Sequence, residues 1–203
     1  MKKNKISKEW INRQHKDIYV RKSKSEGYRS RAVYKLQEIN NKHKILKNGM
    51  SIIDLGAAPG SWSQFVINKF RNCKLVSIDL KEMESIGNSY QIVGDFNEQI
   101  FKNEIIKYFN EKVDLVMSDM AVNTTGNKNL DSVVTGELCL EAMRFAKLQL
   151  KKNGYFVSKI FMGSTFNEII NEAKSAFKEI NIYKPASSRK ESKESFIICS
   201  VLR

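Results

Sequence analysis

Short runs of apolar residues alternate along the chain with longer stretches in which apolar residues recur every three or four positions. Seven runs have the length and composition of strands: 52–55, 75–79, 90–93, 113–117, 155–161, 180–183 and 195–202. Five stretches have helical spacing: 30–39, 62–70, 98–109, 133–150 and 166–177. Helices separate most of the strands, which predicts a mostly parallel seven-stranded sheet with helices on both faces. A polar loop without helical period precedes the last strand, so we expect that strand to run antiparallel.

Composition excludes several classes of protein. With 41% hydrophobic and 28% charged residues, the 203-residue chain has the composition and size of one globular domain. Its cysteines, Cys73, Cys139 and Cys199, lie far apart in apolar segments, and only His15 and His43 are histidines. A disulfide framework, a metal site and a histidine-based hydrolase triad are therefore not expected. No apolar run reaches about 18 residues, so we expect neither a membrane span nor secretion.

The excess positive charge is concentrated in the N-terminal quarter of the chain. Residues 1–47 hold 15 lysines and arginines against four acidic residues, a net charge of +11 out of +13 for the whole chain. Such a segment is typical of binding to a polyanion, because lysine and arginine contacts to phosphates release counterions. A solvated charged surface is the alternative.

A glycine-containing turn joins the first strand to its helix, at the place where α/β folds bring backbone close to a ligand. It reads DLGAAPGSW over residues 54–62. Ala-Ala-Pro separates the two glycines, so the dinucleotide fingerprint lacks its second glycine, and no phosphate-binding lysine follows. The candidate ligand contacts in this turn are Asp54, Gly56, Ala57, Pro59, Gly60 and Trp62.

Two carboxylates follow the next two strands. Asp79 lies 23 positions after Gly56, a suitable spacing for a carboxylate that accepts hydrogen bonds from a ribose diol. Asp95 falls at the same carboxyl edge of the sheet, although either residue alone could be a helix cap. Together with the turn they predict an adenosine-containing ligand, and the lack of a phosphate clamp favours S-adenosylmethionine over NAD or ATP.

An aspartate and a lysine end the fourth and fifth strands. Asp119 follows the strand 113–117, and Lys159 lies within the otherwise apolar strand 155–161. A lysine in such a strand is costly unless it is paired, so we expect Asp119 and Lys159 to be neighbours. The alternative is a lysine whose amine reaches the surface.

Six segments together resemble the FtsJ/RrmJ family of ribosomal RNA large-subunit 2′-O-ribose methyltransferases. They are SRAVYKL (30–36), DLGAAPGSWSQ (54–64), GDF (94–96), SDMA (118–121), VSKIF (157–161) and SSRKESKE (187–194). They occur in the family's order across roughly residues 20–203. Two departures are small: Ser61 stands where a second glycine is common, and Val122 stands where the family usually has proline.

The resemblance implies a Rossmann-like methyltransferase that uses S-adenosylmethionine and no metal, and that releases S-adenosylhomocysteine. The family's Lys-Asp-Lys-Glu active site maps onto Lys35, Asp119, Lys159 and Glu194. Its cofactor contacts map onto Gly60, Trp62, Asp79, Asp95 and Asp119. The family assigns Lys159 to accept the proton of the 2′-hydroxyl, and a lysine that only orients this hydroxyl is the alternative.

The resemblance also implies partners and domains. We expect residues 1–47 to form a basic RNA-binding extension with one helix, and residues 48–203 to form the methyltransferase domain of a single globular unit. The implied substrate is a ribose, of a uridine, in large-subunit ribosomal RNA. We expect a monomer that binds no membrane and works in the cytoplasm, or in a mitochondrion or plastid if a transit segment has been removed.

Three other functions share some of these features. A 2′-O-methyltransferase acting on transfer RNA or on the messenger RNA cap would carry the same four polar residues. An NAD-dependent oxidoreductase is disfavoured by the turn between Gly56 and Gly60 and by the lack of a candidate hydride-site histidine. An RNA-binding module without catalysis is disfavoured because all four polar residues are present.

Overall fold

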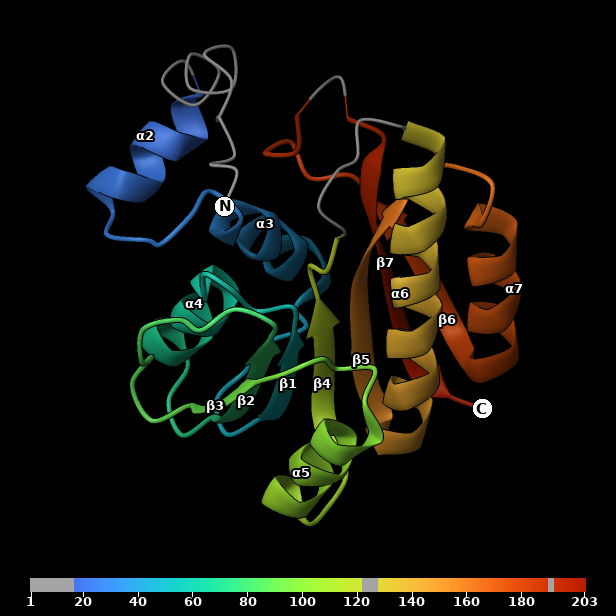
Figure 1. The fold of residues 1–203 in the computed structure, drawn as a ribbon, viewed down its shortest axis with the longest axis horizontal. Helices are drawn as coiled ribbons and strands as arrows, with labels where there is room; N and C mark the ends of the chain where they lie inside the picture. The colour runs from blue at the N-terminus through green and yellow to red at the C-terminus, as the bar shows by residue number, and fades with distance from the viewer. Residues whose placement is uncertain (1–16, 122–127, 190–191) are drawn as a thin grey trace, which may run out of the picture.

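A seven-stranded mixed sheet forms the centre of the molecule (Figure 1). The structure, a computed structural model, describes residues 17–121, 128–189 and 192–203. The strands are β1 (Ser51–Leu55), β2 (Lys74–Asp79), β3 (Tyr90–Val93), β4 (Val113–Ser118), β5 (Leu150–Phe161), β6 (Phe177–Tyr183) and β7 (Glu194–Leu202). Their order is β3-β2-β1-β4-β5-β7-β6. Strand β7 runs antiparallel to both β5 and β6, and the other neighbouring pairs are parallel. The predicted fold class is confirmed.

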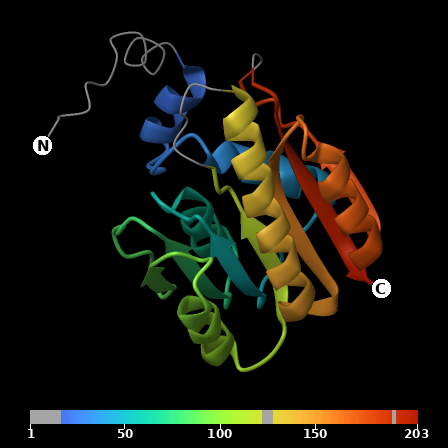
Figure 2. The ribbon, with the colours of Figure 1, turned by 45° about the vertical axis from the view of Figure 1, so that its right-hand side comes forward.

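Helices cover both faces of this sheet (Figures 1 and 2). They are α2 (Ile18–Ser25), α3 (Val33–His43), α4 (Ser61–Lys69), α5 (Gln99–Phe109), α6 (Lys128–Gln149) and α7 (Phe166–Ala176). Helices α3 and α4 pack on one face and α5, α6 and α7 on the other. Neighbouring strand residues alternate between the two cores: Ile52 and Leu115 pack with α3 and α4, whereas Ile53 and Val116 pack with α6. The central strands are therefore apolar on both faces.

One helix and several element boundaries differ from the prediction, among them the ends of α3 and the start of β6. Helix α2 was not expected, because Ser23 is its one buried residue and its apolar pattern is weak. Its start is fixed by Asp17, whose carboxylate accepts hydrogen bonds from the backbone N–H groups of Tyr19 and Val20. Helix α6 begins before residue 133, and β5 begins at Leu150 because pairing with β4 continues across a register shift.

The N-terminal segment shares its core with the rest of the fold. Val33, Leu36 and Ile39 of α3 are fully buried and pack with β1 and α4. Residues 1–16, and with them His15, lie outside the described residues, as do Val122 and two positions of the 187–194 segment. Within the described ranges, no helix is long and apolar enough to span a membrane.

Candidate active site

The turn after β1 holds its shape through backbone hydrogen bonds to the neighbouring strand. The N–H groups of Gly56 and Ala57 both donate to the carbonyl of Ile78 at the end of β2, at 2.9 and 3.1 Å. Gly56 has a φ of +72°, and a Cβ there would lie 2.3 Å from Cγ of Met120. Only glycine fits this position, because both the backbone conformation and the space exclude a side chain.

A cavity of about 480 Å³ opens beside this turn, a volume typical of small-molecule sites. Its lining includes Gly56, Ala58, Asp79, Leu80, Lys81, Asp95, Phe96, Asp119 and Met120. Three of these residues are carboxylates and one is a cation, so the lining suits hydroxyl, amino and cationic groups better than phosphates. The structure thus gathers the acids after β2, β3 and β4 around one space, as the sequence predicts.

The acids after β2 and β3 also accept hydrogen bonds from nearby groups. Asp79 Oδ2 accepts from the backbone N–H of Ala58, and Oδ1 accepts from that of Lys81, both at 2.9 Å. Asp95 Oδ1 accepts from the backbone and side-chain nitrogens of Asn97. These bonds fix the carboxylates. Each Asp79 oxygen keeps a further lone pair for a ligand, and Asp95 can accept from a ligand through Oδ2, since Oδ1 already accepts two bonds.

A smaller cavity of about 50 Å³ adjoins the turn and is lined by Asp54, Gly56, Ala57, Pro59, Trp62 and neighbouring residues. Trp62 is buried, and its indole N–H donates to the carbonyl of Ala32 at 2.9 Å. The Trp62 side chain therefore joins α4 to the start of α3. Gly60, at a φ of +99°, turns the chain into α4.

Asp54 lies beneath the turn and is fully enclosed. Its Oδ2 accepts a 2.6 Å hydrogen bond from Ser63 Oγ, which lies 2.7 Å from Ser77 Oγ. The pKa of the Asp54 carboxyl is raised to about 7, mainly by burial. The hydrogen bond from Ser63 lowers this pKa, and the nearby charges of Asp119 and Asp79 raise it. This buried acid therefore titrates near neutral pH.

Lys159 and Asp119 are paired at the ends of adjacent parallel strands. Lys159 Nζ donates to Asp119 Oδ1 at 2.9 Å and to the Asp119 carbonyl oxygen at 2.6 Å. The Lys159 side chain is 7% exposed. The prediction that this lysine is paired with Asp119 is confirmed. Among the residues that the structure describes, the third Nζ hydrogen has no protein acceptor.

Lys35 and Glu194 complete the cluster from distant parts of the chain. Lys35 Nζ lies 2.9 Å from each carboxylate oxygen of Glu194 and 3.8 Å from Asp119 Oδ1. Ser188 Oγ donates to Glu194 Oε1 at 2.8 Å. The structure thus brings together the four polar residues that the resemblance selects, in the order Glu194–Lys35–Asp119–Lys159. We call these four residues the polar tetrad.

The charges of the tetrad stabilise one another. Burial lowers the pKa of Lys35, but Asp119 and Glu194 outweigh it and hold that pKa above its ordinary value. Burial raises the pKa of Asp119, but Lys159 and Lys35 outweigh this effect and hold it below its ordinary value. Asp119 is therefore ionised and Lys35 protonated at neutral pH.

Arg29 is a residue of the site that the sequence reasoning missed. Its guanidinium donates to the carbonyl oxygens of Pro59, Glu84 and Ser85, at 3.1, 2.8 and 2.9 Å. It thereby ties the glycine turn to the segment after β2. The one sequence feature that could have indicated Arg29 is its place directly before the SRAVYKL segment. No pattern in the sequence relates position 29 to positions 59 and 84.

Two features fit a bound adenosyl cofactor. The larger cavity has a suitable volume, and its three carboxylates match ribose hydroxyls and amino groups without a phosphate-binding cation cluster. No group of three or more histidine, cysteine or acidic side chains that could hold a metal occurs in the part of the chain that the structure describes. The tetrad borders this cavity through Asp119, so a group held by the tetrad lies next to whatever the cavity holds.

Curated relatives match the chain along its whole length. Ribosomal RNA large subunit methyltransferase E of Pelagibacter ubique (strain HTCC1062) is 60% identical over 203 residues, which cover 100% of both chains. The protein of the same name from Legionella pneumophila (strain Paris) is 41% identical over 200 residues, 98% of this chain and 97% of the relative.

Solved structures support the same assignment. A Plasmodium falciparum protein described as a ribosomal RNA methyltransferase superposes with a TM-score of 0.77 at 31% identity, over 86% of this chain and 98% of that one. A Streptococcus mutans protein described as a methyltransferase in complex with SAH has a TM-score of 0.52 at 12% identity, over 85% of this chain and 96% of that one, and so supports the fold alone. The family model of FtsJ-like methyltransferases matches residues 28–202. The chain therefore belongs to the FtsJ-like methyltransferase family.

Proposed function

We propose that this protein transfers a methyl group from S-adenosylmethionine to a ribose 2′-hydroxyl of large-subunit ribosomal RNA. The observation that carries the proposal is the polar tetrad beside a cavity lined by three carboxylates. The names of the relatives, which are ribosomal RNA large subunit methyltransferases, support the choice of RNA. A uridine is the nucleotide that we expect to be modified.

The cavity residues hold the cofactor in this proposal. Asp79 and Asp95 accept hydrogen bonds from its ribose hydroxyls and base, and Asp119 faces the reacting end. When bound, S-adenosylmethionine supplies a methyl group on a cationic sulfur that an incoming oxygen displaces, which leaves neutral S-adenosylhomocysteine. The carboxylates around the cavity favour the cationic form of this ligand.

The tetrad positions the ribose. Asp119 fixes Lys159 through two hydrogen bonds, and the third Nζ valence of Lys159 meets the 2′-hydroxyl. As an ammonium, Lys159 donates to the hydroxyl oxygen and orients its lone pair; as an amine, it accepts the hydroxyl proton. Glu194 holds Lys35 at the other side of Asp119, so that the two lysines enclose the reacting ribose. Alignment of the oxygen with the methyl group supplies most of the rate.

A pH–rate profile separates the two roles of Lys159. Single-turnover methyl transfer that rises with pH, with a rising limb lost in Lys159→Met, supports proton acceptance. A profile without a limb that depends on Lys159 supports the orienting role.

The basic N-terminal segment supplies affinity for RNA in this proposal. Its phosphate contacts are independent of sequence, whereas the 2′-hydroxyl distinguishes RNA from DNA at the target. The protein acts as a monomer in the compartment that holds its ribosomes, the cytoplasm.

A substrate panel tests the proposal. Radiolabelled methyl transfer is measured with large ribosomal subunits, naked ribosomal RNA, transfer RNA and capped messenger RNA, and the label is mapped to an alkali-resistant ribose linkage. We expect label in the large subunit or its RNA. Label confined to transfer RNA or to the cap would assign the same chemistry to another substrate, and label in no RNA would overturn the proposal.

A further inference from the structure

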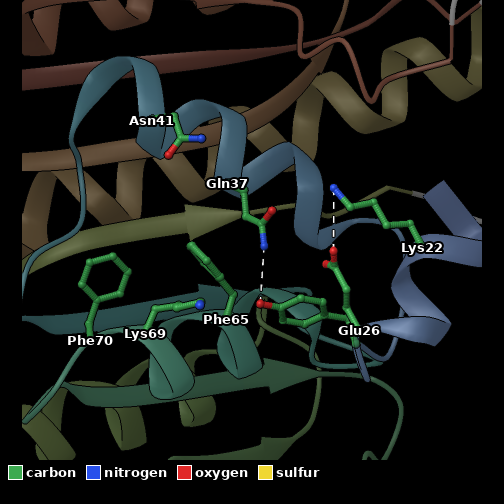
Figure 3. A pocket seen from close by; sticks show the side chains of 8 residues that line it. Lys22, Glu26, Gln37, Asn41, Phe65, Lys69 and Phe70 are labelled. Atoms are coloured by element: carbon green, nitrogen blue, oxygen red, sulfur yellow. Dashed lines mark hydrogen bonds and ion pairs between the residues drawn. The ribbon is translucent and has the colours of Figure 1, made fainter.

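A groove lies on the far side of α3 from the polar tetrad. It encloses about 730 Å³, and its lining comprises Lys22, Glu26, Tyr28, Gln37, Asn41, Phe65, Lys69 and Phe70. Figure 3 shows Gln37 and Asn41 on α3, across the groove from Phe65 and Lys69 of α4 and from Phe70, which follows α4. We call this cavity the α3–α4 groove.

Helix α3 connects the groove to the tetrad. Lys35 points to Glu194 on β7, whereas Gln37, two residues later, points the other way to the hydroxyl of Tyr28. The two sites are therefore separated by about one helix diameter, roughly 10–12 Å. A strand whose ribose lies at Lys35 can reach the groove with a nearby nucleotide.

The walls of the groove combine three kinds of side chain. Phe65 and Phe70 form an edge-to-face pair with ring centroids 5.9 Å apart, and Phe70 and Tyr28 are partly exposed. Asn41 is exposed, and Gln37 makes one long contact of 3.4 Å to the Tyr28 hydroxyl, so both amides can exchange hydrogen bonds with a ligand. Aromatic faces for stacking and amides for base edges are the elements that bind unpaired bases.

The charges at the groove favour an anion. Lys69 is exposed and makes no ion pair within the residues that the structure describes. The one carboxylate, Glu26, is engaged: Tyr34 Oη donates to its Oε2 at 2.9 Å, and Lys22 lies 3.8 Å from its Oε1. The described residues 17–47, which include α2 and α3 beside the groove, hold nine lysines and arginines against three acidic residues, a net charge of +6 that attracts a polyanion.

We propose that the α3–α4 groove binds an unpaired nucleotide of the substrate RNA that flanks the nucleotide held at the tetrad. The base stacks against Phe70 and Tyr28, Gln37 and Asn41 contact its polar edge, and Lys69 contacts a phosphate. This proposal rests on the proposed function for the identity of the RNA, but binding to the groove is measured without methyl transfer.

Binding of a fluorescein-labelled oligouridylate of about twelve nucleotides tests the groove, since single-strand sites span roughly 4–16 nucleotides. Phe70→Leu keeps an apolar side chain but removes the ring, and we expect it to raise Kd about fivefold or more. Lys69→Ala is expected to reduce the slope of log K against log salt by about 0.7, the loss of one single-strand phosphate contact.

The matched control is Lys107→Ala, which removes an exposed lysine from α5, far from α3 and α4 (Figure 1). We expect it to leave Kd and salt slope unchanged. Thermal unfolding followed by circular dichroism checks that Phe70→Leu is folded. Lys69→Ala replaces an exposed residue and should not affect folding, so it still tests the proposal if Phe70→Leu fails to fold. If Phe70→Leu and Lys69→Ala both match Lys107→Ala, the proposal is overturned.

Kinetics on the natural substrate distinguish this proposal from the proposed function. In the groove variants, KM for RNA is expected to rise while kcat and the affinity for S-adenosylhomocysteine stay unchanged. If the wild-type protein methylates the RNA and the groove variants do so with unchanged KM and kcat, the proposed function stands and the proposal that the groove binds RNA is overturned. Variants that bind oligouridylate normally but slow methylation of assembled subunits alone would assign the groove to a ribosomal protein, which also overturns the RNA proposal.

Discussion

Replacing Asp54 with asparagine is expected to change the pH dependence of stability. The pKa of this buried carboxyl is raised to about 7 from an ordinary value of 3.8. Because the folded-state pKa is raised, the folded state binds more protons than the unfolded state between pH 4 and pH 7. The stabilisation from Asp54 is therefore complete below about pH 4 and is lost as pH rises to about 7.

The size of this effect follows from the difference in pKa. At 1.36 kcal/mol per pKa unit, the rise corresponds to about 4 kcal/mol, or about 1.4 kcal/mol per pH unit across the window. Asp54 is 1% exposed, so solvent screening is slight. The asparagine oxygen can still accept the hydrogen bond from Ser63 Oγ, so the substitution isolates the charge.

Urea unfolding of both proteins from pH 4.5 to pH 8 measures the effect. We expect Asp54→Asn to gain about 3 kcal/mol of stability relative to wild type between pH 4.5 and pH 8, since part of the full effect falls below pH 4.5, and the gain to level off above pH 7. Glu111→Gln, which removes an exposed acid, is the control and should follow the wild-type curve. A difference between Asp54→Asn and wild type that stays constant across this range would show that the pKa of Asp54 is not raised in the folded state.

Three further substitutions have expected outcomes. Glu194→Gln removes the charge that holds Lys35, so the single-turnover rate of methyl transfer, measured by quench kinetics, should fall about 10- to 100-fold. Cofactor affinity, measured by calorimetry, should stay unchanged. Gly56→Ala places a Cβ 2.3 Å from Met120, so binding of S-adenosylhomocysteine should be lost in calorimetry; retained affinity would count against the close packing of the turn. Arg29→Met removes three hydrogen bonds to the turn and to the segment after β2, so we expect its Kd for S-adenosylhomocysteine, measured by calorimetry, to rise about tenfold. Wild-type affinity in this variant would show that these bonds do not shape the cavity.

The strands could be predicted from sequence because burial on both faces leaves unbroken apolar runs. All five residues of β1 are buried, which is what a parallel central strand requires. Helix α2 could not be predicted, because most of its side chains face solvent and its start depends on one capping aspartate. The start of β5 was missed because Leu150 pairs with Val113 apart from the main run of pairs. Pairing with β4 resumes at Tyr155 after a register shift, and only this second part has the apolar pattern of a strand.

The candidate site divides in the same way. Asp119 and Lys159 could be predicted as neighbours because both lie near the carboxyl ends of adjacent parallel strands, one position after the paired residues Ser118 and Ser158. Lys35 and Glu194 are separated by 159 positions, and no periodicity in the sequence relates α3 to β7. Only the family resemblance selected this pair, and the structure places Lys35 Nζ 2.9 Å from Glu194 Oε2. Arg29 was missed because its three partners are carbonyl oxygens, which carry no trace in the sequence.

Single-turnover methyl transfer by Lys159→Met measures whether the polar tetrad drives the reaction. Lys151→Met is a matched control, because Lys151 lies on the same strand and forms the same 2.9 Å ion pair with a β4 aspartate, Asp114, outside the tetrad. On large-subunit ribosomal RNA, Lys159→Met is expected to lose about 100-fold or more in rate while it still binds S-adenosylhomocysteine, and Lys151→Met to match wild type. If Lys159→Met labels an alkali-resistant ribose at the wild-type rate, Lys159 has no role in methyl transfer.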